Sequence, residues 1–352
     1  MILHPAFRPR VIVVPLALAL LVPLLSGHAA TTPAGATPAG AAESSLGWTD
    51  PLDSENGKLN VVITVAPISS IVRNVGGARI NLHGIIPDGS DSHTFEPAPS
   101  DAKLLSQADL VIANGLDLED PTLELAKANL KSTAEILTLG DQTIAPEQYA
   151  YDFSFPKEDG HPNPHLWMNV PFAMKYAQLV AAKLEARDAA NARTYGQNLD
   201  RYLATLTRLD AGIMTAVQTI PAGQRKLLTY HDSFAYFAQH YGMTVIGAAQ
   251  PSDFSEPSPQ EVAGLIDHIK REKVPVVFGS EVFPSKVLEQ VARESGATYV
   301  DKLRDDDPPG QPGAPEHTYV GLILNDMRLM IPALGGNVDA LTGISPSDTY
   351  AS

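Results

Sequence analysis

Short apolar runs alternate with helical stretches along most of the chain. The runs are rich in branched apolar residues and are followed by turn residues, which is typical of strands buried on both faces of a sheet. They occupy residues 59–66, 80–86 and 110–114 in the first half and residues 226–230, 243–246, 274–279 and 298–300 in the second. Helical patterns fall between them, for example at residues 261–273 and 285–295. This alternation predicts an α/β fold with a parallel sheet in each half of the chain.

A longer helical pattern separates the two halves. Between residues 191 and 218 apolar residues recur at helical spacing, and Pro221 and Gly223 end the pattern. At 1.5 Å per residue this helix would be roughly 40 Å long. A helix of that length can connect two domains, although a surface helix with one apolar stripe would give the same pattern.

The N-terminal residues have the pattern of an export signal. Arg8 and Arg10 precede an apolar run at residues 11–25, and Gly27-His28-Ala29 has the form of a cleavage site. We predict a signal peptide at residues 1–29, with an uncleaved anchor as the alternative. Residues 30–58 are rich in Ala, Thr, Pro, Gly and Ser, and we predict that they form a disordered linker.

The 352 residues exceed what one core usually holds, so we predict two domains. An N-terminal α/β lobe spans residues 59–190, a connecting helix residues 191–220, and a C-terminal α/β lobe residues 221–352. The acidic segment 305–317, rich in Pro and Gly, is expected to be a solvated surface loop.

Charge and cysteine content exclude several functions. A net charge of −15 argues against nucleic acid as a partner, because phosphate binding needs a basic surface. The chain has no cysteine, which excludes disulfides, thiolate metal sites and lipid attachment through an N-terminal cysteine.

Four residues spread almost evenly along the chain are candidate metal ligands: His93, His165, His231 and Asp301. His231 and Asp301 directly follow predicted strands, and His93 lies in the loop after another. Ligands of open α/β sheets bind beyond the carboxyl ends of the strands. Three imidazoles and one carboxylate suit a borderline divalent metal such as zinc.

The segments around these residues resemble the zinc/manganese ABC-transporter substrate-binding proteins. The similarity runs from about residue 59 to about residue 334. It is carried by His93-Thr94-Phe95-Glu96-Pro97, Pro164-His165-Leu166-Trp167, His231-Asp232-Ser233-Phe234, Gly279-Ser280-Glu281 and Val300-Asp301-Lys302-Leu303.

The resemblance implies two α/β lobes joined by a long rigid helix, with the metal in the cleft between them. It maps the ligands onto His93, His165, His231 and Asp301. Family members with His as third ligand usually bind zinc, and those with Glu bind manganese or iron. The implied function is an exported, periplasmic or cell-envelope protein, a monomer, that delivers Zn²⁺ to an ABC permease. Mn²⁺ or iron is the alternative cargo.

Some features depart from the family or leave roles open. The segment 152–161 is short and holds one histidine, where zinc members often have a long His-rich loop. Asn163 replaces the usual aspartate, His161 is a possible auxiliary metal contact, and Glu281 is either an acceptor for a ligand imidazole or a surface carboxylate of the cleft. The remaining histidines, His317 among them, are expected at the surface.

Two other function classes remain possible. A zinc hydrolase would need an open coordination position and a general base. Glu96, Asp232 and Glu281 qualify by residue type alone, and the chain has no His-Glu-x-x-His motif. A surface adhesin or structural protein of the same fold would carry a vestigial site. We therefore expect a binding protein and not an enzyme.

Overall fold

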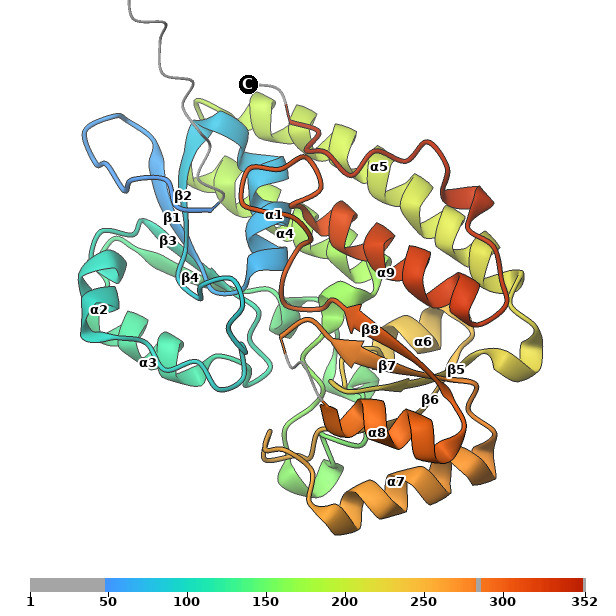
Figure 1. Cartoon of the computed structure of the whole chain (residues 1–352). Coiled ribbons are helices and arrows are strands. Elements are labelled where there is room, and N and C mark those ends of the chain that lie inside the picture. Colours follow the sequence, from blue (N-terminus) through green and yellow to red (C-terminus); the bar gives the residue numbers. More distant parts are fainter. Residues whose placement is uncertain (1–47, 283–285, 351–352) are drawn as a thin grey trace, which may run out of the picture. The chain divides into compact units, whose positions relative to one another are not determined.

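The computed structural model describes residues 48–282 and 286–350 (Figure 1). Two four-stranded sheets, each with helices packed around it, confirm the predicted α/β fold with two lobes. The predicted signal peptide lies outside the described residues. Among the helices of the described segments, none is long and apolar enough to cross a membrane.

The first sheet has the strand order β2-β1-β3-β4, and every pairing in it is parallel. Its central strands are buried because they carry apolar side chains on both faces. The fourth strand was missed in the sequence, since it is short and begins with a charged residue at the sheet edge. The strands are β1 (Leu59–Ile63), β2 (Ile80–Gly84), β3 (Leu110–Ala113) and β4 (Glu135–Thr138).

The second sheet repeats this arrangement with the parallel order β6-β5-β7-β8. Its last strand extends to Leu303, three residues beyond the predicted end, and the register of β7 and β8 shifts between Phe278 and Ser280. Lys302 has a positive φ of 68° within this irregular end. The strands are β5 (Lys226–Thr229), β6 (Thr244–Ala248), β7 (Val276–Ser280) and β8 (Thr298–Leu303).

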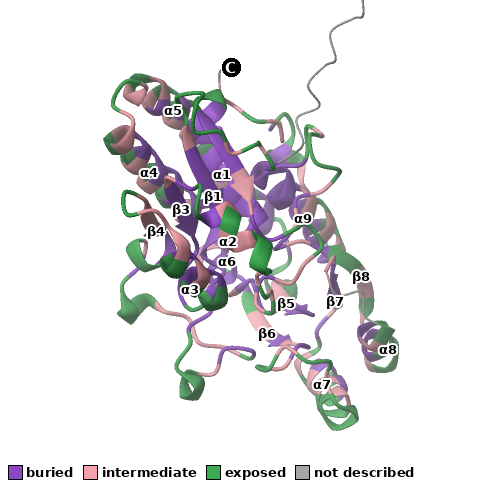
Figure 2. Ribbon diagram, turned by 90° about the vertical axis from the view of Figure 1, so that its left-hand side faces the viewer, coloured by how far each residue is buried: buried purple, intermediate pink, exposed green. Residues whose placement is uncertain are grey.

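Helices cover both sheets, and the amphipathic ones turn one face to the core. Burial follows this division: the central strands and α1 are buried, whereas α7 has an exposed outer face (Figure 2). The helices are α1 (Ala66–Gly76), α2 (Pro99–Leu105), α3 (Asp120–Asn129), α4 (Val170–Arg187), α5 (Ala192–Gln218), α6 (Ala235–Tyr241), α7 (Pro259–Glu272), α8 (Lys286–Ser295) and α9 (Tyr319–Ala333).

The long helix α5 has 27 residues and lies where the sequence predicted it. It packs against α1 and α4 of the first lobe and also contacts α6 of the second. Tyr202, Leu206 and Leu209 of its apolar stripe are fully buried.

The last helix, α9, returns to the first lobe. It packs on α1 and α5, and the backbone N–H of Tyr319 donates to Ser70 Oγ at 2.8 Å. The Tyr319 hydroxyl donates to the Trp167 carbonyl at 2.7 Å. One continuous apolar core therefore contains residues of both lobes. The second sheet begins with β5, after α5, whereas α9 packs into the core of the first lobe.

Residues 48–58 form an N-terminal strap along the first lobe. Trp48 is buried and stacks on His317, with ring centroids 5.4 Å apart. Asp50 forms a salt bridge with Arg73 at 2.6 Å, and Thr49 forms an isolated antiparallel β-bridge with His83. The prediction of a disordered linker is therefore wrong for residues 48–58, because a buried indole and an ion pair fix them. Residues 30–47 lie outside the described residues.

Candidate metal centre

The structure brings the three predicted histidines together. His93 Nε2 lies 3.2 Å from His165 Nε2, and His231 Nε2 lies 2.9 Å from the same atom. One donor atom from each ring lies within 4.8 Å of the other two. Three imidazoles from segments far apart in the chain thus converge on one point, as the ligands of a single ion do.

Two of the histidines lie in loops that leave the carboxyl ends of strands, and His165 lies near the end of β3, because the Asn114 side chain donates to the Pro164 carbonyl at 3.0 Å. His93 lies in the loop between β2 and α2, His165 precedes α4, and His231 follows β5. Asp91 shapes the His93 loop, because its carboxylate accepts the backbone N–H of His93 at 2.9 Å and the Thr94 hydroxyl at 2.9 Å. The site therefore uses the carboxyl ends of the parallel strands, where α/β folds bind ligands.

Asn163 fixes the ring of His165. Its Oδ1 accepts from His165 Nδ1 at 2.8 Å and from the His165 backbone N–H at 3.1 Å. Because Nδ1 carries the proton, the lone pair of Nε2 points towards the other histidines. The Asn163 amide also donates to the Asp232 carbonyl at 2.6 Å, next to His231. Asn163 thus links His165 to the segment that carries His231.

Burial sets the charge of these rings. His165 and His231 are buried, and His93 is partly exposed. Desolvation lowers the pKa of all three rings, and charge repulsion from neighbouring histidines lowers the pKa of His93 and His165 further. Neutral imidazoles offer lone pairs, so the cluster is prepared to receive a cation rather than to carry charge itself.

Asp301, the fourth predicted ligand, does not lie with the histidines. Its side chain is exposed and accepts a hydrogen bond from the Tyr299 hydroxyl at 3.1 Å. The prediction placed Asp301 just beyond a strand ending at Val300, whereas β8 continues to Leu303. The carboxyl end of this strand therefore comes later in the chain.

Asp305 lies just beyond the carboxyl end of β8 and beside His231. Its side chain is buried, and its Oδ2 lies 3.7 Å from His231 Nε2. Among the described residues this oxygen has no hydrogen-bond partner. Burial raises the pKa of Asp305 to about 7. A buried carboxylate oxygen without a partner, beside three imidazoles, is a suitable fourth donor for a cation.

The segment expected to be a solvated loop is instead anchored at its start. Asp305, Asp306 and Asp307, here called the aspartate turn, follow β8, and the first two are buried. Asp306 Oδ1 accepts from the Ser92 hydroxyl at 3.0 Å, and Asp307 Oδ2 accepts from the Gly89 backbone N–H. Sequence reasoning missed the turn because an acidic run usually indicates solvent exposure. Three successive carboxyl groups directly after a strand were the available signal.

Glu281 contacts this turn rather than an imidazole. Its Oε1 accepts the backbone N–H groups of Asp305, Asp306 and Asp307 at 3.0, 3.3 and 3.1 Å. Desolvation and the nearby Asp305 raise the pKa of Glu281 to about 7. Neither predicted role of Glu281 matches these contacts.

A pocket of about 170 Å³ leads to His93. Phe155 and Phe254 form its apolar wall, and the Phe254 ring stacks on His93 with centroids 4.4 Å apart and planes inclined by 16°. Phe254 has a positive φ of 57°, which is strained for a bulky residue. His161 lies at the rim, exposed and paired with Asp117 at 2.9 Å, and does not join the converging rings.

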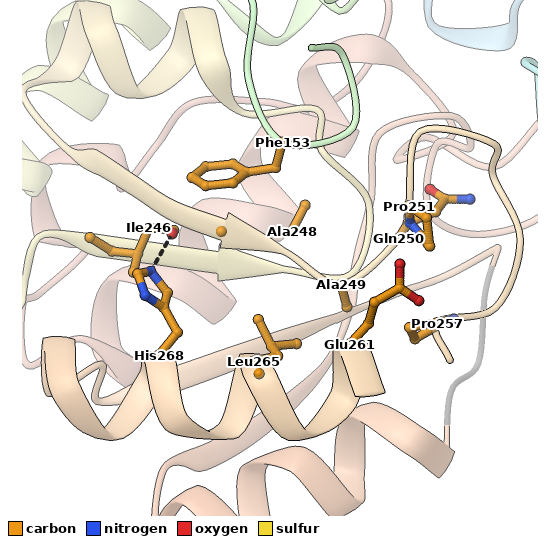
Figure 3. Close-up of a pocket in the computed structure, with 12 residues that line it drawn as sticks. Phe153, Ile246, Ala248, Ala249, Gln250, Pro251, Pro257, Glu261, Leu265 and His268 are labelled. Carbon is orange, nitrogen blue, oxygen red and sulfur yellow. Dashed lines mark hydrogen bonds between the residues drawn. The ribbon is translucent and has the colours of Figure 1, made fainter. Parts of the chain in front are cut away.

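A second pocket, of about 370 Å³, lies between β6 and α7 (Figure 3). The Phe153 ring lies on one side of the pocket, and Leu265 and His268 lie on the opposite side. None of the three converging histidines lines this pocket. Two of its polar groups are already engaged, because the His268 ring donates to the Ile246 carbonyl at 2.9 Å and Glu261 caps α7. The Gln250 side chain, which also lines the pocket, has no hydrogen-bond partner among the described residues. Among the described residues, His93, His165 and His231 form the group that could hold a metal ion.

A carboxylate oxygen together with the three imidazole nitrogens would make a closed four-coordinate set, which suits binding rather than catalysis. The candidate bases of a hydrolase are engaged or remote. Asp232 accepts the Ser154 backbone N–H at 2.8 Å, Glu281 holds the aspartate turn, and Glu96 is exposed.

Comparison with known proteins shows which family the chain resembles. The family described as zinc-uptake complex component A, periplasmic, matches residues 61–331. The iron-binding protein YfeA of Yersinia pestis is 31% identical over 266 residues, covering 76% of this chain and 83% of YfeA. The manganese ABC transporter substrate-binding lipoprotein scaA of Streptococcus gordonii is 30% identical over 261 residues, covering 72% and 82%.

Solved structures of metal-binding proteins have a similar fold. The periplasmic zinc-binding protein TroA of Treponema pallidum superposes with a TM-score of 0.72 at 28% identity, covering 79% of this chain and 99% of TroA. These relatives are substrate-binding proteins and not enzymes, and their names cover zinc, manganese and iron. This chain belongs to the family of metal ABC transporter substrate-binding proteins.

Proposed function

We propose that this protein captures Zn²⁺ outside the cytoplasm and delivers it to an ABC permease. The observation that carries the proposal is the convergence of three neutral imidazoles beside the buried carboxylate of Asp305. Three nitrogen donors favour zinc over the harder Mn²⁺, which prefers oxygen. The proposed ligands are His93, His165, His231 and Asp305, with Asp305 in the place first assigned to Asp301.

Manganese is the second candidate, and iron the third, because relatives are named for these metals. The His231 position separates the candidates. His231→Glu would replace a nitrogen by an oxygen donor while keeping the other three, so it should lower the preference for zinc over manganese.

Metal analysis tests the proposal directly. Protein purified without added metal should contain zinc by elemental analysis. Competitive titration should give tighter binding of Zn²⁺ than of Mn²⁺, and His93→Ala and His231→Ala should both weaken zinc binding strongly. Unchanged zinc affinity in both variants would refute the proposed site, and preferential retention of Mn²⁺ by the native protein would refute the choice of metal.

We also propose that the protein acts as a monomer in the periplasm or cell envelope. Its relatives include periplasmic proteins and lipoproteins, whereas this chain has no cysteine to lipidate. Sedimentation of the metal-loaded protein tests the monomer, and fractionation of producing cells tests the location.

A further inference from the structure

One carboxylate oxygen holds three successive peptide groups next to the proposed metal site. Glu281 follows β7 directly, and its Oε1 accepts the N–H groups of the whole aspartate turn at 3.0 to 3.3 Å. Successive backbone N–H groups that point inwards form a concave anion-binding nest. Glu281 fills this nest from within the protein, so the curvature of the turn depends on its carboxylate.

The nest fixes the residue that faces His231. The Asp305 N–H is held by Glu281, and the Asp305 carbonyl accepts from Trp167 Nε1 at 2.9 Å. With both backbone groups held, little freedom remains for the direction of the side chain. Its Oδ2 is placed 3.7 Å from His231 Nε2.

The aspartate turn also forms hydrogen bonds with the first lobe. Asp306 accepts from Ser92, the residue before His93, and Asp307 accepts from Gly89. Glu281 therefore supports a turn that contributes one donor of the site and holds the loop that contributes another. Loss of the nest would disturb the relative positions of donors from both lobes.

We propose that Glu281 is a positioning residue for metal binding, which acts by holding the aspartate turn so that Asp305 completes the coordination of the ion. This inference rests on the proposed function. It assigns to Glu281 no contact with the metal or with any imidazole. Partners that orient metal ligands typically change affinity by about 10–100-fold when they are removed.

The test is a double-mutant cycle read by zinc affinity. Glu281→Gln should weaken Zn²⁺ binding by about 10–100-fold. In a protein that already carries Asp305→Ala, the same change should weaken Zn²⁺ binding by a clearly smaller factor, because only its effect through the His93 loop remains. Equal penalties in both backgrounds would overturn the inference, as would unchanged affinity of the single variant.

Glu119 provides the matched control. Its carboxylate accepts the backbone N–H groups of Asn114 and Gly115 at 2.7 and 3.0 Å in the first lobe, and burial raises its pKa to about 7 as well. Any effect of Glu119→Gln on zinc binding should be additive with Asp305→Ala. Coupling of similar size in both cycles would mean that buried carboxylates act only through general stability.

Two further measurements separate the possible failures. Glu281→Asp keeps the charge but is one methylene too short to fill the nest, so it should weaken zinc binding as Glu281→Gln does. An unchanged Glu281→Asp variant would overturn the positioning role in favour of charge alone. The visible spectrum of the Co²⁺-loaded protein should lose its four-coordinate intensity in Glu281→Gln, and a spectrum like that of the unmodified protein would contradict the inference. If the unmodified protein binds no zinc, the proposed function itself fails.

Discussion

Replacement of Asp305 by Asn should change zinc affinity and metal-free stability in opposite directions. The carboxylate is fully buried, and its pKa is raised from 3.8 to about 7. Such a group stabilises the fold below its unfolded pKa, and this contribution is lost as the pH rises through about 7. At pH 8 the ionised form therefore opposes folding by about 4 kcal/mol, so Asp305→Asn should raise the melting temperature of the metal-free protein.

Zinc affinity should fall in the same variant. Removal of a residue that only supports a ligand costs about 10–100-fold, so loss of a charged donor should cost more than about 100-fold at pH 8. Below pH 7 the native protein must first release the Asp305 proton, which costs about 1.4 kcal/mol per pH unit. The difference in affinity between the two proteins should thus shrink about tenfold by pH 6.

The assay is competitive titration with a zinc chelator at pH 6 and pH 8, with thermal unfolding of the metal-free proteins. Asp301→Asn is the matched control. The carboxylate of Asp301 is exposed, and the residue lies in β8, the strand that leads to Asp305. This control should change neither quantity. The reasoning is refuted if Asp301→Asn loses affinity as Asp305→Asn does, or if Asp305→Asn lowers both affinity and stability.

Three further outcomes are expected. Phe254→Ala removes the ring stacked on His93 and should release zinc about tenfold faster in stopped-flow exchange with a chelator. Phe153→Ala, which changes an exposed ring, should leave the release rate unchanged. Equal release rates for the two variants would contradict the role of Phe254 in covering His93. Burial and the nearby Asp232 raise the pKa of Asp152 to about 9, so the stability that its protonated form contributes is lost as the pH rises towards 9. Asp152→Asn should therefore reduce the fall in metal-free stability between pH 7 and 9 by about 1.4 kcal/mol per pH unit. An unchanged slope in denaturant titrations would count against a buried acid at this position. Trp48→Ala should destabilise the protein by about 3 kcal/mol in denaturant unfolding, and a loss under about 0.5 kcal/mol would mean that the N-terminal strap is not part of the core.

Much of the fold and most of the site follow from local patterns. The strands and the helix α5 are visible because their apolar residues repeat with a fixed period, and His231 directly follows such a strand. His93 and His165 lie in short motifs of distinctive composition. These features depend on neighbours in the sequence, so the sequence alone indicates them.

The carboxylate that lies beside the histidines is buried by distant residues, and the sequence pointed to Asp301 instead of Asp305. Whether an aspartate is buried depends on Glu281 and Trp167, which lie 24 and 138 residues away in the chain. The irregular end of β8 carries the strand past Asp301, and no periodic pattern reveals such an irregularity. His317 was expected at the surface for a similar reason, since Trp48 covers it from the other end of the described chain.

The return of α9 to the first lobe has a consequence for how the chain folds. Met327, Met330 and Ile331 of this helix are fully buried in the core that also holds β1 and α1. The first lobe therefore cannot close its core until the last helix of the chain has been synthesised, and contacts this distant in sequence form slowly. Such a delay keeps the apolar surface of the first lobe exposed until α9 has packed against it.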